Sequence, residues 1–189
     1  MIYTISGKLT YKEDDALVVQ VGGLGLLVSC PLPLIERAKI GSTINLFCFF
    51  HAEQFQLFGF VKKEELDLFE LLLLVSGVGP RSAMKIMSAH SSADIRTMIA
   101  LDQAQELAQG AGIGQKTAAR IILELRGKVQ AVASALRGKD DHEAVAEALK
   151  VLGYAKKDIA YALDHIPSSA KRLEEKVRGA LQALAKHHA

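Results

Sequence analysis

The sequence predicts an α+β, multidomain fold in three parts: an N-terminal OB-fold β-barrel, a domain of tandem helical hairpins, and a C-terminal three-helix module. Three observations lead to this prediction. Hydrophobic periodicity is strand-like over residues 1–62 and helical from residue 63 onward. A glycine pattern at residues 77–79 recurs at residues 112–114, which indicates a repeated structural unit. A loosely patterned stretch at residues 128–141 then sets the last segment apart.

Residues 1–62 are expected to form short strands with a helical plug. The strand segments are rich in β-branched, leucine and aromatic residues and are bounded by turn signals. They are Ile2–Thr10, Ala16–Val21, Leu24–Cys30, Thr43–Phe50 and Gln54–Phe60. Gly22-Gly23 is a hairpin signal, and a short helix from Leu34 to Ala38 is expected after the third strand. Such a set fits a small closed barrel, a fold that hosts many functions.

Residues 63–127 are expected to form a helical domain. The run Leu71–Val75 is apolar on every side, which predicts a helix buried in its own domain or against another subunit. A later stripe has the i, i+3, i+4, i+7 spacing of a helix face that packs on a core. Its members are Ala118, Ile121, Ile122 and Leu125.

The C-terminal region is expected to be a small tethered module. Residues 128–141 read as a flexible linker, and helical stretches follow at 142–152, 156–165 and 170–187. The turn Leu152-Gly153-Tyr154 resembles that of ubiquitin-associated (UBA-like) modules, which usually offer an apolar patch to a protein partner. A simple bundle with Tyr154 packed inside is the equal alternative.

The repeat supplies the candidate binding residues. Each copy joins two glycines to a helix start and follows them with two cations on one helix face. Backbone N–H groups at a helix N-terminus, with its positive dipole end, form a seat for an anion such as a phosphate. One copy alone would fit an ordinary αα-hairpin equally well, but two copies in register favour phosphate binding. The DNA-binding candidates are Gly77, Gly79, Arg81, Lys85, Gly112, Gly114, Lys116, Thr117 and Arg120.

Composition excludes several other classes of protein. The net charge is only +2, so positive charge does not coat the surface, and stretches in which cations outnumber acids are found at the two motifs. No apolar run reaches the roughly 18 residues of a membrane span, and no signal peptide is recognisable, so we expect a cytoplasmic protein. Cys30 and Cys48 lack metal-ligand spacing and are expected to be reduced core residues. We expect no metal site, no cofactor and no catalytic residue.

The repeated pattern resembles the helix-hairpin-helix DNA-binding motif, in which paired hairpins grip the two strands of a duplex without reading sequence. Over the whole chain, the order of parts resembles the RuvA family of Holliday-junction-binding proteins. The segments that carry the resemblance are Gln56–Phe60, Ser76–Pro80, Gly112–Gly114, Lys116–Ala118 and Leu152–Tyr154.

The resemblance implies a set of partners. Four protomers would form a flat homotetramer, alone or paired into an octamer, that holds a four-way junction open and square. The hexameric ATPase RuvB would dock on the C-terminal module, through Leu152, Gly153 and Tyr154, and drive branch migration in recombination and repair. The junction nuclease RuvC would be a further partner. The chain itself would be no enzyme, and its sequence has no P-loop for ATP.

The resemblance also implies an acidic pin, a turn between the last barrel strands that carries two neighbouring acids to the junction centre. At the matching place the sequence reads His51-Ala52-Glu53-Gln54, with Glu53 as the only acid. Two further departures lie in the second motif, where Gln115 replaces an expected cation and Ala111 replaces an expected proline. They bear on how strongly that motif binds phosphate.

Two other functions compete with junction binding. A base-excision glycosylase would use a carboxylate a short way beyond the second motif, yet residues 129–136 contain no acid and Asp140 and Asp141 fall in the predicted linker. A general duplex-binding scaffold would bind linear duplex and four-way junction equally well. The sequence favours junction binding over both.

Overall fold

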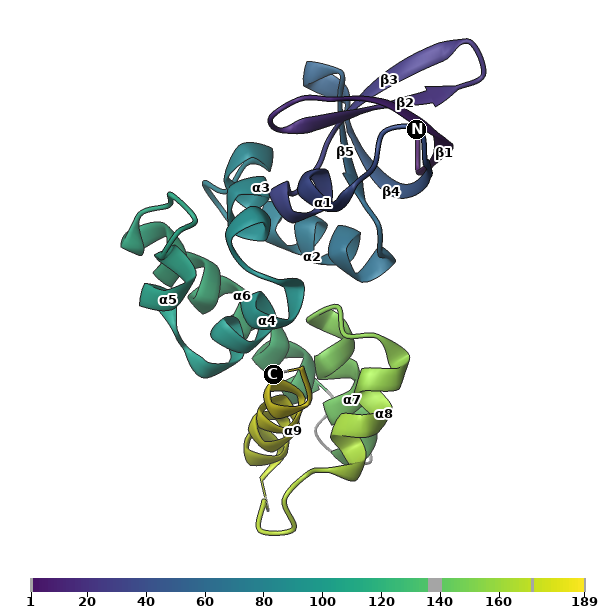
Figure 1. Ribbon diagram of the computed structural model, residues 1–189. Helices are drawn as coiled ribbons and strands as arrows, with labels where there is room; N and C mark the ends of the chain where they lie inside the picture. Colours follow the sequence, from purple (N-terminus) through teal and green to yellow (C-terminus); the bar gives the residue numbers. More distant parts are fainter. Residues whose placement is uncertain (1, 136–140, 171, 189) are drawn as a thin grey trace.

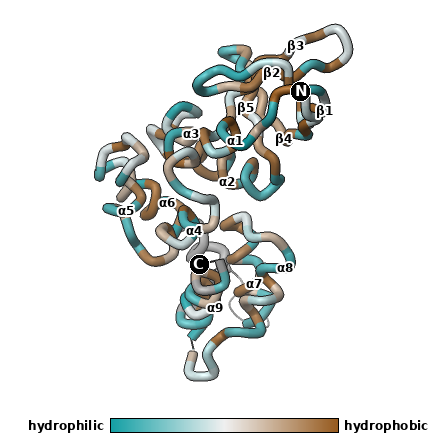
Figure 2. The backbone as a smooth tube through the Cα atoms, viewed as in Figure 1, coloured by the Kyte–Doolittle hydropathy of each residue, from teal (hydrophilic) through white to brown (hydrophobic). Residues whose placement is uncertain are grey.

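The computed structural model describes residues 2–135, 141–170 and 172–188. The barrel lies at one end of the molecule, the helices that follow it lie in the middle, and the C-terminal helices lie at the other end (Figure 1). Figure 2 shows hydrophobic and hydrophilic positions alternating along most helices, as amphipathic elements require. The three predicted parts are therefore present in the predicted order.

The N-terminal part is a closed barrel with the strand order β1-β2-β3-β5-β4. Its strands are β1 (Thr4–Lys12), β2 (Ala16–Val21), β3 (Leu24–Ser29), β4 (Thr43–His51) and β5 (Gln56–Phe60). Strands β3 and β5 pair in parallel and close the barrel, while the other pairs are antiparallel. Helix α1 (Leu32–Arg37) lies between β3 and β4. The predicted barrel and its helical plug are confirmed.

The barrel interior is filled by alternate residues of its strands. Leu17 and Val19 of β2 are fully buried, and Val28 of β3 faces the same core. Both cysteines are buried and free, and burial raises the pKa of the Cys48 thiol to about 11. The thiols therefore behave as small apolar core groups, as the sequence predicts.

The central part consists of α2 (Lys63–Leu73), α3 (Pro80–Ala89), α4 (Ser92–Leu101), α5 (Ala104–Ala108) and α6 (Gln115–Ala135). The predicted stripe on α6 is buried, with Ala118 and Ile121 at 0% exposure. Helix α2 joins this domain to the barrel through Phe69. The centre of the Phe69 ring lies 5.5 Å from that of Phe49, 5.3 Å from that of Phe58 and 5.0 Å from that of Phe60. This aromatic cluster fixes how the helices sit on the barrel.

The C-terminal part consists of α7 (Asp141–Val151), α8 (Lys156–Asp164) and α9 (Leu173–His188). Its buried side chains, such as Val145 and Leu149, belong to one continuous apolar core with those of the central helices. The boundary at residue 127 does not mark the end of a helix, because α6 continues to Ala135. Residues 136–140 of the predicted linker lie outside the described residues, so linker flexibility stays a prediction.

Candidate nucleic-acid interface

Two glycine turns lead into two helix N-termini. Gly77, before α3, has a φ of +80°, and Gly112, before α6, has a φ of +60°. Both positions lie in the left-handed region that favours glycine. Gly79 and Gly114 have no positive φ, but a Cβ atom added to either would meet no atom of the chain within 4 Å. Packing within the chain therefore does not require glycine at these two positions, and the space in front of them is open to a ligand.

The helix N-termini behind these turns carry no negative charge of their own. The first turn of α3 contains no acid, and its N-cap, Gly79, makes no side-chain capping hydrogen bond. The first turn of α6 also contains no acid. A helix start exposes backbone N–H groups without intrahelical partners together with the positive end of the dipole. Both starts are therefore suited to binding an anion.

A cation from each motif lies beside the glycine turn of the other motif. Arg120 of α6 lies beside the first turn, where its Nη1 is 3.5 Å from a Cβ built on Gly77 and donates to the carbonyl of Ser76 at 3.4 Å. Lys85 of α3 lies beside the second turn, with its Nζ 4.0 Å from a Cβ built on Gly112. Each turn is thus flanked by a cation from the other motif, which joins the two turns into one basic face.

The charged groups of this face are available to a ligand. Arg81, Lys85, Lys116 and Arg120 are exposed, and no ion pair joins them to a carboxylate within the described part of the chain. Arg126, farther along α6, instead pairs with Asp102, with 2.7 Å between Nη1 and Oδ2. A nearby acid, Glu124, accepts a hydrogen bond from the Ser76 backbone N–H at 3.2 Å. Thr117 is half-buried.

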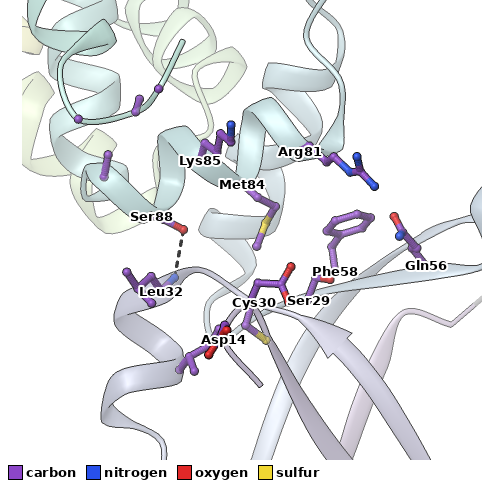
Figure 3. A pocket seen from close by; sticks show the side chains of 16 residues that line it. Asp14, Ser29, Cys30, Leu32, Gln56, Phe58, Arg81, Met84, Lys85 and Ser88 are labelled. Atoms are coloured by element: carbon purple, nitrogen blue, oxygen red, sulfur yellow. Dashed lines mark hydrogen bonds between the residues drawn. The ribbon is translucent and has the colours of Figure 1, made fainter. Parts of the chain in front are cut away.

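A cavity of about 670 Å³ separates α3 from the barrel. Figure 3 shows Arg81 pointing across it toward Gln56 and Phe58 of β5. The backbone N–H of Leu32, at the start of α1, donates to Ser88 Oγ of α3 at 3.1 Å. This hydrogen bond joins α1 and α3 at the edge of the cavity. The cationic face is therefore held at a fixed angle to the barrel.

The predicted pin lies at the connection between β4 and β5. Residues Ala52–Gln54 form a single 3₁₀ turn, so β5 begins at Gln56 and not at Gln54 as the sequence suggests. Glu53 is exposed on this turn. His51 is half-buried, and its Nδ1 has no hydrogen-bond partner among the described residues. An exposed carboxylate at this turn is what the pin requires.

The predicted partner-binding turn lies in the interior. Leu152 is 2% exposed and Tyr154 is 7% exposed. Arg96 of α4, itself 6% exposed, donates from Nε to the carbonyl of Leu152 at 2.9 Å and from Nη2 to the carbonyl of Glu64 at 2.7 Å. Its guanidinium lies 5.3 Å from the centre of the Tyr154 ring. This geometry matches the alternative in which Tyr154 packs inside, and a role in partner binding stays a prediction.

Sequence reasoning missed Arg96. Burial lowers the pKa of the Arg96 guanidinium and raises the pKa of the Tyr154 phenol, so Tyr154 stays neutral. Arg96 lies in an ordinary amphipathic helix, and the residues around it in the sequence give no signal that it contacts another domain. Only the approach of the Leu152–Tyr154 turn to α4 in space gives it that role.

The described residues contain no cluster of three or more histidine, cysteine, aspartate or glutamate side chains arranged to hold a metal ion. In the same part of the chain, none of the helices combines the length and apolarity needed to cross a membrane.

Comparison with known proteins gives matches along the whole chain. Residues 1–59 match the RuvA N terminal domain, residues 69–128 the SAM-like helix-hairpin-helix tandem, and residues 140–185 the RuvA C-terminal domain. The chain is 37% identical over 190 residues to the Holliday junction branch migration complex subunit RuvA of Chloroflexus aggregans, covering 96% of this chain and 97% of the relative. The protein of the same name from Roseiflexus sp. is 36% identical, with 96% and 98% covered. That from Acholeplasma laidlawii is 39% identical, with 86% and 88% covered.

Proposed function

We infer the function from a premise that these matches establish: the chain belongs to the RuvA family. The relatives are named as subunits of a Holliday junction branch migration complex. We propose that this chain likewise binds four-way junction DNA without sequence specificity, and that it serves branch migration in homologous recombination and DNA repair.

The observation that carries this proposal is the basic face formed by the two crossed motifs. Backbone N–H groups, Lys85 and Arg120 are suited to phosphate oxygens, which position a protein on DNA but carry no base sequence. Two turns on one face can reach both backbones of one duplex arm. The open space before Gly79 and Gly114 allows the phosphates to approach the helix starts closely.

The proposal includes assembly of four copies, alone or as paired tetramers. Large apolar side chains on the surface are available for contacts between copies, because burying them in an interface would remove apolar area from water. They include Leu24 at 68%, Leu27 at 52%, Leu74 at 62% and Leu123 at 74% exposure. Fourfold symmetry would place four copies of Glu53 around the centre of a square junction.

The proposed motor is the ATPase RuvB, which would hydrolyse ATP while this chain shapes the DNA. The nuclease RuvC would cut the junction. The complex would work in the cytoplasm. We propose the C-terminal module as the docking site for RuvB. Because Leu152 and Tyr154 are covered by Arg96, docking through that turn requires the module to leave its place on α4. Docking through another surface of the module would leave this contact intact.

Features of the chain argue against the competing functions. A glycosylase would need a free carboxylate just beyond the second motif, yet Asp141 there is paired with Lys176, with 2.7 Å between Oδ2 and Nζ. A general duplex binder would have no use for an acid on the turn at Glu53, since an exposed carboxylate repels phosphate.

A binding panel tests the proposal. Four-way junction, three-way junction and linear duplex of equal total length are titrated with the full chain, with random-sequence competitor DNA present. Junction binding predicts a clear preference for the four-way species and no dependence on arm sequence. Equal affinity for junction and linear duplex would support the general scaffold instead. Release of a base from damaged duplex would support a glycosylase.

A further inference from the structure

The turn between β4 and β5 carries an exposed aromatic ring next to its acid. Phe55 is 85% exposed, more than the other large apolar side chains on the described surface, of which Leu123 reaches 74%. It is also one of two non-glycine residues in the described chain with a positive φ, at 52°. A bulky side chain rarely adopts this conformation, and such a departure points to a function for the residue.

Packing within the chain does not explain Phe55. Its ring meets the Phe50 ring edge-on, with 6.0 Å between centres and 76° between planes. Its backbone N–H closes the 3₁₀ turn on the carbonyl of Ala52 at 3.4 Å, a bond that any residue could make. An asparagine or glycine would adopt this φ more readily than phenylalanine does. The turn therefore presents an aromatic face to solvent at a position where the fold itself favours a different residue.

We propose that Phe55 is a DNA contact that stacks on a base exposed at the junction crossover. The location of the turn at the crossover rests on the proposed function, and the stacking chemistry rests on the exposed ring. Bases offer flat π faces to aromatic side chains whatever their sequence. Glu53 and Phe55 lie two residues apart on one turn and act on different parts of the nucleotide. The carboxylate repels phosphates, while the ring receives a base that has left its stack.

Stacking by Phe55 compensates for the single acid on this turn. Four carboxylates around a fourfold axis carry half the charge of the eight that four turns with two acids each would place there. Four aromatic rings at the same place stabilise unpaired bases directly, and this interaction is insensitive to salt screening. The turn therefore combines an electrostatic contact with a stacking contact at the point where strands separate.

Three substitutions distinguish the aromatic face of Phe55 from its apolar bulk. Phe55→Tyr keeps the aromatic face, Phe55→Leu keeps apolar bulk without the ring, and Phe55→Asn removes both at a φ that asparagine tolerates. Each variant is compared with the wild-type chain on a four-way junction and on linear duplex. A 2-aminopurine base next to the crossover reports base stacking, and sedimentation reports assembly. Thermal unfolding confirms that each variant folds.

The expected result is a selective loss at the junction. Phe55→Leu and Phe55→Asn bind the four-way junction at least about 10-fold more weakly, since that is the order expected for losing a single base stacked on an aromatic ring and the substitution removes the ring from every copy. Their affinity for linear duplex, their assembly and their thermal stability are unchanged. Phe55→Tyr behaves as the wild type and keeps the 2-aminopurine signal that Phe55→Leu loses.

Other results overturn the proposal. Junction binding of Phe55→Leu at the wild-type level would mean that the ring itself has no role. A change in sedimentation in step with the loss of binding would assign Phe55 to a contact between copies of the chain. A wild-type chain that binds junction and duplex equally would refute the proposed function instead, which is a separate result from the same titrations.

Discussion

Replacing Gly114 by aspartate should abolish DNA binding while leaving the fold at least as stable as before. Gly114 directly precedes α6, and its carbonyl accepts the first helical hydrogen bond, from the Ala118 N–H at 3.1 Å. A Cβ added there meets no atom within 4 Å, and the φ is not positive. The substitution therefore causes neither a clash nor backbone strain within the chain.

The two consequences have opposite signs. Aspartate is a preferred N-cap residue, so its side chain stabilises the start of α6 by a few tenths of a kcal/mol relative to glycine. The same carboxylate would lie about 5 Å from a bound phosphate, where two like charges repel by about 3 kcal/mol at an effective dielectric constant of about 20. A loss of that size weakens binding by more than about 100-fold.

Fluorescence anisotropy on a labelled four-way junction measures the loss, and thermal unfolding followed by circular dichroism measures stability. Gly127→Asp is the matched control, since Gly127 is exposed on the same helix and is also free of neighbouring atoms within 4 Å. It lies about 20 Å from Gly114 along the helix, beyond the screening length of about 10 Å. Equal junction affinity of the two folded variants would refute the assignment of Gly114 to a phosphate contact.

Three further substitutions test other parts of the account. Lys116→Ala should lower the slope of log K against log salt by about 0.9 per lost phosphate contact, whereas Arg126→Ala should change it less because Arg126 pairs with Asp102; equal slopes would contradict this. Glu53→Gln should tighten junction binding at low salt, with the gain shrinking at high salt, and an unchanged affinity would make Glu53 an inert surface acid. Arg96→Ala should reduce the free energy of unfolding by about 2 kcal/mol, because the buried carbonyl of Leu152 and the part-buried carbonyl of Glu64 lose their donor. An unchanged free energy of unfolding in a denaturant titration would contradict this.

The barrel and the glycine turns could be predicted from the sequence because their signals are local. Strand alternation identifies the barrel segments, and Gly-x-Gly before a helical stripe identifies each turn. Glycine can be required at such a turn by a positive φ or by the close approach of a ligand. Gly77 and Gly112 have a positive φ, whereas Gly79 and Gly114 do not and have open space before them, as the proposed phosphate contact requires. A sequence pattern does not distinguish these two uses of glycine.

Features that depend on tertiary packing could not be predicted. The approach of Arg120 to the first turn and of Lys85 to the second depends on how the two hairpins are placed in space, which a local sequence pattern does not specify. The burial of Tyr154 requires α4 to present Arg96 to it. Residues 128–135 were predicted as part of the linker because the hydrophobic pattern loosens there, although α6 continues to Ala135 and its alanine content favours a helix.

The most direct test of the central claim is the shape of the bound junction. Fluorescence energy transfer is measured between dyes on each pair of adjacent arms of a four-way junction, in magnesium, with and without the full chain. With the chain bound, we expect the unequal values of the folded free junction to converge on one value for all adjacent pairs, as in an open square. With Gly114→Asp, we expect the values of the free junction to stay unchanged. A bound junction that keeps its unequal values, or convergence with Gly114→Asp as well, would contradict the claim that the two hairpins hold the arms.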